Sequence, residues 1–283
     1  MSTDLPTLAV TGSTGALGGR VARRLASSDI PQRLLARDVA RVPKVDGGVS
    51  LTFTGYADRA SAVAALEGVE TLFMVSAAES ANRLEEHKSF VDAAGEAGVR
   101  QVVYTSFHGA APDCSFTLGR DHFNTEEHIR ASGMEWTFLR DNFYLDFLPH
   151  MAGEDGVIRG PAGDGLVAAV SRDDVAACAA TVLAEPGAHA GRCYSLTGSE
   201  ALSLATVAER MSVALDRPIS YHDETIEEAY ESRKKWPAPD WMYDAWVSTY
   251  TAIANGEVAE VTDHVRTLTG RPPLTLADLL GQR

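Results

Sequence analysis

Three evenly spaced glycines near the N-terminus could hold a phosphate-bearing ligand. Gly12, Gly15 and Gly18 form a G-x-x-G-x-x-G pattern within the stretch AVTGSTGALGGRVARRL at positions 9–25. Glycine permits positive φ angles and lets backbone N–H groups approach a ligand closely. The helix expected after them would add unpaired donors and partial positive charge at its N-terminus. The pattern predicts a cradle for a pyrophosphate, and a tight turn without a ligand is the alternative.

A second test of a dinucleotide site lies about 20 residues further on, where an acidic residue would bind the ribose 2′-hydroxyl of NAD. This chain has Arg37 there, followed by Asp38, and Arg41 is close enough to help. A guanidinium matches a 2′-phosphate in charge and in its fork of donors. We therefore predict NADP(H) as the cofactor, preferred over NAD(H). In the alternative, Arg37 is only solvated and Asp38 binds the ribose.

Alternating strands and helices would position these residues. Apolar β-rich runs predict strands at 7–11, 33–36, 49–53, 71–76, 101–106 and 135–140. Helical spacing and capping residues predict helices at 16–27, between Asp58 and Gly68, at 79–97 and at 119–132. This rhythm is typical of successive βαβ units. It predicts an α/β fold with a doubly wound parallel sheet.

The C-terminal half has longer loops and a mixed pattern. The stretch GVIRGPAGDGLVAAVS at 156–171 predicts a glycine-rich hairpin, and helices are expected at 173–185, 203–215 and 224–235. Pro237 and Pro239 would break the chain before the aromatic run WMYDAWVSTY. We expect a dinucleotide-binding domain over residues 1–150 and a smaller α/β substrate-binding part over residues 151–283, interleaved with the first.

The composition limits the classes of partner. The chain has 283 residues, 45% of them hydrophobic, and a formal net charge of −14. This charge disfavours nucleic acid and anionic membranes, and no run approaches the roughly 18 apolar residues of a transmembrane helix. No secretory signal is visible, and the separated Cys114, Cys178 and Cys193 make no disulfide framework. We predict a cytoplasmic protein with a small-molecule substrate and no metal, and a homodimer is one candidate assembly.

Several stretches together resemble one family. The atypical short-chain dehydrogenases of the NmrA-like group are similar to this chain in VTGSTGALGG, LARD, FMVS, AAGEAGVRQVVYTSF, HFNTEEHIRASG and WTFLRDNFY. Within that group, the chain looks most like the type 2 NAD(P)H:quinone oxidoreductases, and the resemblance extends to TAIANGEVAEVTDHVRTLTGRPPLTLADLL near the C-terminus. The resemblance implies a Rossmann-like domain that binds NADP(H). It also implies a smaller C-terminal part that closes over the nicotinamide end.

Carried over position by position, the resemblance assigns residues to each part of the dinucleotide. The pyrophosphate would be wrapped by Thr11, Gly12, Ser13, Thr14, Gly15, Ala16, Leu17 and Gly18. Arg37 would meet the 2′-phosphate, Gly55 and Tyr56 would flank the adenine, and Ser76 and Ala77 would line the nicotinamide ribose. The nicotinamide and the substrate would be bordered by Ser106, Phe107, His108, Asn142, Phe143 and Tyr144.

The Tyr-x-x-x-Lys pair of ordinary short-chain dehydrogenases is absent. Tyr104 lies inside an expected strand and is followed four residues later by His108 instead of lysine. His122 stands where some relatives carry a lysine, and it could bind the ribose or supply a proton near neutral pH. His122 and Tyr144 are therefore the candidate catalytic residues, and His108, Phe143 and Tyr144 are candidates to contact the substrate. The alternatives are a surface role for His122 and core packing for the aromatic residues.

The missing pair favours a substrate that needs little acid catalysis. Reduction of a ketone needs a proton donor, worth roughly 10²- to 10⁴-fold in rate. A quinone needs less help, because hydroquinone oxygens are more acidic and aromatisation drives hydride delivery. We predict an NADPH-dependent oxidoreductase that transfers a hydride directly to a quinone or a similar flat electrophile. The alternatives are a non-catalytic NADP(H)-binding redox sensor of the NmrA type and a dedicated reductase of a biosynthetic pathway.

Overall fold

The computed structural model describes residues 5–281, and the chain divides into two compact units. The first unit contains the chain up to Ser106 together with Asp121–Arg140 and Asp173–Tyr194. The second contains Phe107–Arg120, Asp141–Arg172 and the chain from Ser195 onward. Each unit is therefore assembled from three separate stretches of the chain.

A seven-stranded sheet forms the centre of the first unit. Its strands are β1 (Leu8–Val10), β2 (Gln32–Ala36), β3 (Gly48–Thr52), β4 (Thr71–Met74), β5 (Gln101–Phe107), β6 (Glu135–Asp141) and β9 (Arg192–Leu196). Their order across the sheet is β3-β2-β1-β4-β5-β6-β9, and the pairings among β1 to β5 are parallel. The chain runs outward from β1 in one direction and then from β4 in the other. This confirms the predicted doubly wound, Rossmann-like α/β sheet.

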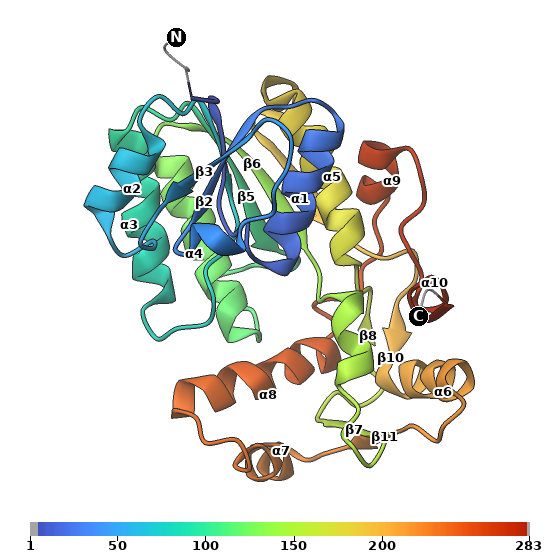
Figure 1. Cartoon of the computed structure of the whole chain (residues 1–283). Helices are drawn as coiled ribbons and strands as arrows, with labels where there is room; N and C mark the ends of the chain where they lie inside the picture. The colour runs from blue at the N-terminus through green and yellow to red at the C-terminus, as the bar shows by residue number, and fades with distance from the viewer. Residues whose placement is uncertain (1–4, 282–283) are drawn as a thin grey trace. The chain divides into compact units, whose positions relative to one another are not determined.

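Helices cover both faces of this sheet (Figure 1). One face carries α1 (Ala16–Ser27) and α5 (Arg172–Ala184), and the other carries α2 (Arg59–Leu66), α3 (Arg83–Glu96) and α4 (Thr117–Ala131). Two short 3₁₀ helices, η1 (Val39–Arg41) and η3 (Pro186–His189), complete the unit. Buried apolar side chains from the sheet, α2, α3 and α4 form one continuous core. Asp58 caps α2 by accepting from the Ser61 N–H, as its position in the sequence predicted.

The second unit contains short strands and several helices. Its elements are η2 (Leu145–His150), β7 (Val157–Gly160), β8 (Leu166–Val167), β10 (Leu202–Ser203), α6 (Leu204–Leu215), β11 (Ser220–Asp223), α7 (Ile226–Arg233), α8 (Asp240–Ala254), α9 (His264–Thr269) and α10 (Leu276–Gly281). The helices predicted at 203–215 and 224–235 are present as α6 and α7. None of the helices between residues 5 and 281 combines the length and hydropathy that a membrane-spanning segment requires.

The predicted hairpin at 156–171 is wrong. β7 pairs in parallel with β11, and β8 pairs antiparallel with β10, so the two strands belong to separate two-stranded sheets. Gly160, the last residue of β7, and Gly165, just before β8, serve close packing instead of a hairpin turn. A Cβ on Gly160 would lie 2.1 Å from the Tyr250 ring, and one on Gly165 would lie 2.2 Å from the Ile253 carbonyl oxygen.

Candidate functional site

The glycine loop connects β1 to α1 and has a shape that only glycine allows. Gly12 has a φ angle of +62°, and its carbonyl accepts a hydrogen bond of 2.8 Å from the Gly15 N–H. A Cβ on Gly18 would lie 2.4 Å from the Gly12 carbonyl oxygen, so the helix and the loop approach too closely for any side chain there. Gly15 is the N-cap of α1 and gives no side-chain cap, and the first turn of α1 holds no acidic residue. This helix end therefore fits an anionic group such as a pyrophosphate.

The predicted loop residues fall into two sets. Thr11, Ser13, Leu17 and Gly18 are buried, and Gly12, Thr14, Gly15 and Ala16 are exposed. The Ser13 hydroxyl donates to the Leu35 carbonyl at 3.3 Å, which ties the loop to β2. Two of the four exposed residues, Gly12 and Gly15, have no side chain. This is expected of a loop that binds a ligand through its backbone N–H groups.

The other predicted residues of the first unit follow the same edge of the sheet. Because parallel strands end at one edge, the residues after β1 to β4 come together there with the end of β5. These are Thr11, Arg37, Gly55 with Tyr56, Ser76 with Ala77, and Ser106. The fold therefore brings these segments to one edge of the sheet.

Arg37 and Asp38 after β2 have different roles in the structure. Asp38 turns back to cap η1, where its carboxylate accepts from the Ala40 N–H at 3.0 Å. Arg37 and Arg41 are both exposed. This arrangement gives the carboxylate a structural partner and leaves the guanidinium groups on the surface next to the edge of the sheet.

Tyr56 braces the glycine loop from the end of β3. Its hydroxyl lies 2.7 Å from Thr11 Oγ1 and donates to the Val75 carbonyl, while its ring stacks on Phe90 with a centroid distance of 4.2 Å. Thr11 Oγ1 also accepts from the Val75 N–H at 2.9 Å. Burial raises the pKa of Tyr56, so its hydroxyl keeps its proton. The start of the loop is thus held to the end of β4.

The segment after β4 is held at several points. The Ser76 N–H donates to Thr105 Oγ1 at 2.8 Å, and the Ala77 N–H donates to His87 Nε2 at 2.8 Å. The Ala77 carbonyl accepts from Arg83 Nε at 3.1 Å. The N–H and the carbonyl of Ala77 are therefore both held by side chains of α3.

His122 lies in a buried polar network, so the surface alternative for this residue is wrong. Its exposed fraction is 7%, its Nδ1 lies 2.9 Å from the Tyr104 hydroxyl, and its Nε2 lies 3.0 Å from Arg83 Nη2. A guanidinium only donates, so Nε2 accepts and the ring proton lies on Nδ1, which donates to the Tyr104 oxygen. His87 has the same tautomer, because its Nε2 accepts from Ala77 and its Nδ1 lies 2.9 Å from Thr125 Oγ1.

Burial and the nearby cation keep both histidines neutral. Desolvation, and then the charge of Arg83, lower the pKa of His87 to about 2. The same two causes hold the pKa of His122 well below its ordinary value, with smaller contributions from His87 and Arg140. A protonated imidazolium near neutral pH is therefore disfavoured at both positions.

Ser106, near the end of β5, hydrogen-bonds to the buried Glu126, which forms ion pairs with two arginines. Its hydroxyl donates to Glu126 Oε1 at 2.6 Å. Glu126 also accepts two hydrogen bonds of 2.7 Å from Arg140, and Arg130 lies 3.2 Å from its second oxygen. Hydrogen bonding to Glu126 raises the pKa of Arg140. The Ser106 proton is thus committed to Glu126.

Aromatic side chains form a cluster in the second unit. Phe107, Phe116 and Phe143 lie with ring centroids 4.8 to 5.2 Å apart. Asn142 supports this cluster, since its amide donates to the Val258 carbonyl at 2.9 Å and its side-chain oxygen accepts from the Phe143 N–H at 2.7 Å. His108 is 4% exposed, and its backbone N–H donates to the Asp141 carbonyl at 2.8 Å. The rings are inclined to one another by 51° to 74°, and Phe107 and Phe116 are buried, so Phe143 is the partly exposed member of the cluster.

Tyr144 is bound within the second unit by charged groups. Its hydroxyl donates to Asp141 Oδ2 at 2.6 Å, and the Arg172 guanidinium lies 4.3 Å from the centre of its ring. Desolvation, and then the charge of Asp141 and this hydrogen bond, raise the pKa of Tyr144 well above its ordinary value. The Tyr144 phenol therefore loses its proton less readily than an ordinary tyrosine does.

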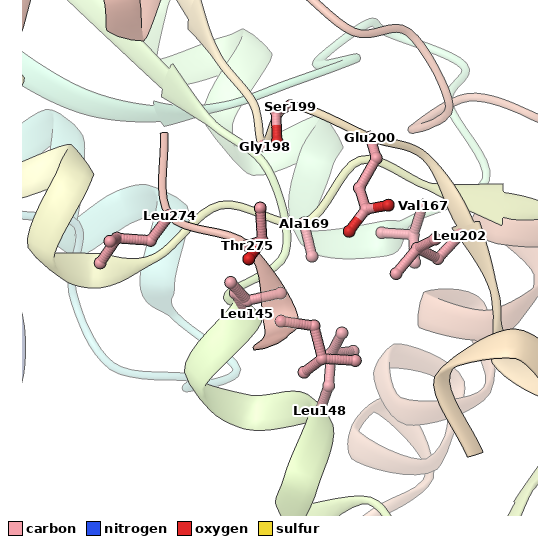
Figure 2. A pocket seen from close by; sticks show the side chains of 11 residues that line it. Leu145, Leu148, Val167, Ala169, Gly198, Ser199, Glu200, Leu202, Leu274 and Thr275 are labelled. Atoms are coloured by element: carbon pink, nitrogen blue, oxygen red, sulfur yellow. The ribbon is translucent and has the colours of Figure 1, made fainter. Parts of the chain in front are cut away.

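A separate pocket of the second unit contains none of the predicted site residues (Figure 2). Its wall is mostly apolar, with Leu145 and Leu148 of η2 facing Val167 and Leu202. Glu200 is the acidic member of the wall, and its carboxylate pairs with Arg210 at 2.6 Å. Among residues 5–281, no group of histidine, cysteine and acidic side chains could hold a metal ion.

Sequence reasoning missed the residues that hold the predicted ones in place. These are Arg83 and His87 on α3, Glu126 on α4, and Asp141, Phe116 and Arg172. Arg83 stands in the first turn of a helix, where a cation is unfavourable to the helix dipole. This was the one local sign of a special role, but its partners lie far along the chain.

Comparison with known proteins places the chain among dinucleotide-dependent reductases. A family described as "NmrA-like family" matches residues 5–243. The NAD(P)H azoreductase of Xenophilus azovorans is 33% identical over 273 residues, covering 95% of each chain. Quinone oxidoreductase 2 of Escherichia coli K12 is 31% identical over 278 residues, covering 96% of each chain.

A solved structure agrees with these matches. The NADPH-dependent quinone oxidoreductase of Escherichia coli in complex with NADPH superimposes with a TM-score of 0.87 at 29% sequence identity. The match covers 97% of this chain and 99% of that one. The similarity therefore extends over both units of the chain.

Proposed function

Because this chain belongs to the NmrA-like family, we propose that it is an NADPH-dependent oxidoreductase that reduces a quinone or a similar flat electrophile. Two relatives are named as reductases that use NAD(P)H or act on quinones, and a similar structure was solved with NADPH. The observation that carries the proposal is the glycine loop. It reaches the N-terminus of α1 so closely that a Cβ on Gly18 would lie 2.4 Å from the Gly12 carbonyl oxygen.

The residues of the first unit would bind the dinucleotide. The backbone of Thr11–Gly18 would hold the pyrophosphate, and Arg37 would pair with the 2′-phosphate. The capping role of Asp38 supports NADPH over NADH, because its carboxylate is already hydrogen-bonded to the Ala40 N–H. Gly55 and Tyr56 are proposed for the adenine. Ser76, Ala77 and His122 are proposed for the nicotinamide ribose, and Ser106 for the nicotinamide.

The remaining predicted residues belong to the second unit. Phe107 and Asn142 are proposed for the nicotinamide end, and His108, Phe143 and Tyr144 for the substrate. The partly exposed Phe143 supports a flat substrate, because ring faces bind planar electron-poor molecules well.

Bound NADPH supplies a hydride, and the protein would contribute binding and orientation. The geometry gives neither candidate acid a free proton: His122 directs its proton to Tyr104, and Tyr144 directs its own to Asp141. A ketone would need such an acid, whereas a quinone forms a stable hydroquinone anion that solvent can protonate. We therefore favour a binding role for His122 and a quinone-like substrate.

The test is a titration of the purified protein with NADPH and with NADH, followed by addition of a simple benzoquinone. Tight NADPH binding and rapid oxidation after quinone addition are the expected results. Tight binding with oxidation no faster than in buffer would favour the non-catalytic sensor, and a panel of azo dyes and enones would then separate it from a reductase of another substrate. Equal affinity for NADH and NADPH would contradict the role of Arg37.

A further inference from the structure

Arg83 is a buried cation at the N-terminus of a helix, where a positive charge is unfavourable. It begins α3, and the positive end of the helix dipole opposes a cation in the first turn. Its exposed fraction is only 4%, so its charge has also lost most of its water. Both facts oppose an arginine here, and such conflicts with local preference are typical of functional positions.

The guanidinium contacts three groups in two parts of the first unit. Nε donates to the Ala77 carbonyl at 3.1 Å, Nη2 donates to His122 Nε2 at 3.0 Å, and Nη1 lies 3.4 Å from Asp121 Oδ2. Only the planar fork of an arginine can reach in these three directions at once. Arg83 therefore connects the segment after β4 with the N-terminal part of α4.

Two consequences follow for groups that the proposed function assigns to the ribose. The His122 imidazole is locked in the neutral Nδ1–H form, because its other nitrogen accepts from Arg83. The Ala77 position is locked as well, because its carbonyl binds Arg83 and its N–H binds His87. Without the Arg83 guanidinium, the His122 imidazole and the Ala77 carbonyl could change orientation independently of each other.

We propose that Arg83 is a positioning residue that holds the Ala77 peptide and the His122 imidazole in one arrangement for the ribose–nicotinamide end of NADPH. This inference rests on the function proposed above. Arg83 itself acts through its neighbours. The charged and titratable groups around His122 are Arg83 and His87 from α3, Tyr104 from β5, Arg140 from β6 and Asp121 from its own helix.

The first measurement follows the histidine ring in the protein without cofactor. Nitrogen NMR of histidine-labelled protein from pH 5 to pH 8 should show His122 as one neutral Nδ1–H tautomer that does not titrate. A His122→Asn variant assigns the resonance. In Arg83→Met the resonance should move toward a mixture of the two neutral tautomers, because the donor to Nε2 is gone. An unchanged His122 resonance in a folded Arg83→Met variant would overturn the proposal.

The second measurement is NADPH affinity. Arg83→Met should raise the dissociation constant about tenfold, because it removes charged hydrogen bonds that hold two cofactor-facing groups. The matched control is Arg59→Met, which also begins a helix but has a side chain 52% exposed, and it should change neither readout. Equal NADPH affinity in wild type and Arg83→Met would also overturn the proposal.

A conservative variant covers the case in which Arg83→Met does not fold. Arg83→Lys keeps the charge but loses the fork, so His122 should stay neutral while NADPH affinity falls about threefold. Wild-type affinity in Arg83→Lys would show that the fork positions nothing. If the wild-type protein binds no NADPH, the proposed function fails, and the NMR comparison still decides whether Arg83 fixes His122.

Discussion

Each unit holds a tyrosine hydroxyl in a hydrogen bond, and the partners of these two hydroxyls differ. In the first unit, Tyr104 faces the neutral His122, which Arg83 holds from its other side. In the second unit, Tyr144 donates to the carboxylate of Asp141 beneath the guanidinium of Arg172. In the first unit, Arg83 extends the network to the Ala77 carbonyl at the edge of the sheet. In the second unit, Tyr144 contacts Asp141 and Arg172, and it directly follows Phe143 of the aromatic cluster in sequence.

This difference matches two kinds of recognition. A dinucleotide has fixed polar groups, so a site for it needs backbone and side-chain donors held in one geometry. A flat organic substrate needs shape and apolar surface more than a precise set of donors. We therefore expect changes in the first unit to act on NADPH binding and a change at Phe143 in the aromatic cluster to act on the substrate.

The largest effect is expected from Gly18→Ala in the first unit. Its Cβ would meet the Gly12 carbonyl oxygen at 2.4 Å, so the loop must shift away from α1. NADPH affinity should fall about a hundredfold, which corresponds to about 2.7 kcal/mol. Fluorescence titration measures it, with circular dichroism to check folding.

Gly95→Ala is the matched control for this variant. Gly95 also lies in a helix, α3, but nothing stands within 4 Å of its added Cβ. This variant should bind NADPH normally and be more stable by about 0.5–1 kcal/mol, because alanine favours a helix. A Gly18→Ala protein with wild-type affinity would mean that the glycine loop does not bind the pyrophosphate.

The neutral histidines of the first unit predict a loss of stability in mild acid. The pKa of His87 is about 2 in the folded protein and about 6.5 when unfolded. Between these values only the unfolded chain takes up the proton, so stability present above pH 6.5 is lost as the pH falls. His87 alone should lower the free energy of unfolding by about 2 kcal/mol between pH 7 and pH 5, and His122 acts in the same direction.

Urea denaturation at pH 7 and pH 5 measures this loss. A His87→Gln variant keeps an acceptor for the Ala77 N–H but has no group that titrates in this range. The difference between the two pH values should therefore shrink by about 2 kcal/mol in this variant. An undiminished difference in His87→Gln would show that His87 is not the source.

Arg37→Ala should separate the two cofactors. The variant removes a charged partner of the 2′-phosphate, so NADPH affinity should fall about tenfold and NADH affinity should hardly change. Parallel titrations with both dinucleotides measure the effect. Arg41→Ala, another exposed arginine three residues past Asp38, should have a smaller effect. Equal losses for NADH and NADPH would contradict the proposed contact with the 2′-phosphate.

Local patterns were enough to predict the first unit's architecture and its loop. The glycine spacing, the Asp58 cap and the alternation of strands and helices all depend on neighbours in sequence, and the structure has each of them. The hairpin prediction failed because β7 pairs with a strand more than 50 residues away. Glycines that look like turn residues instead allow close packing at Gly160 and Gly165.

The support around the site could not be predicted in the same way. His122 was selected by its place in a helix, but its contact with Arg83 joins residues 39 positions apart. Its neutral state depends on burial, which a sequence does not show at a polar position. The same holds for Ser106, whose proton goes to Glu126 across the space between β5 and α4.

The smallest effect tests the second unit. Phe143→Leu keeps an apolar side chain but removes one of the three rings that lie 4.8 to 5.2 Å apart. The KM for a benzoquinone should rise about fivefold, since aromatic contacts contribute about 1 kcal/mol beyond the area they bury. NADPH affinity should stay unchanged, and steady-state kinetics with saturating NADPH measures the difference. Phe147→Leu is the control, because Phe147 is 53% exposed and lies outside the cluster. If Phe143→Leu weakened NADPH and left the quinone KM unchanged, the division of roles between the polar network and the aromatic cluster would be wrong.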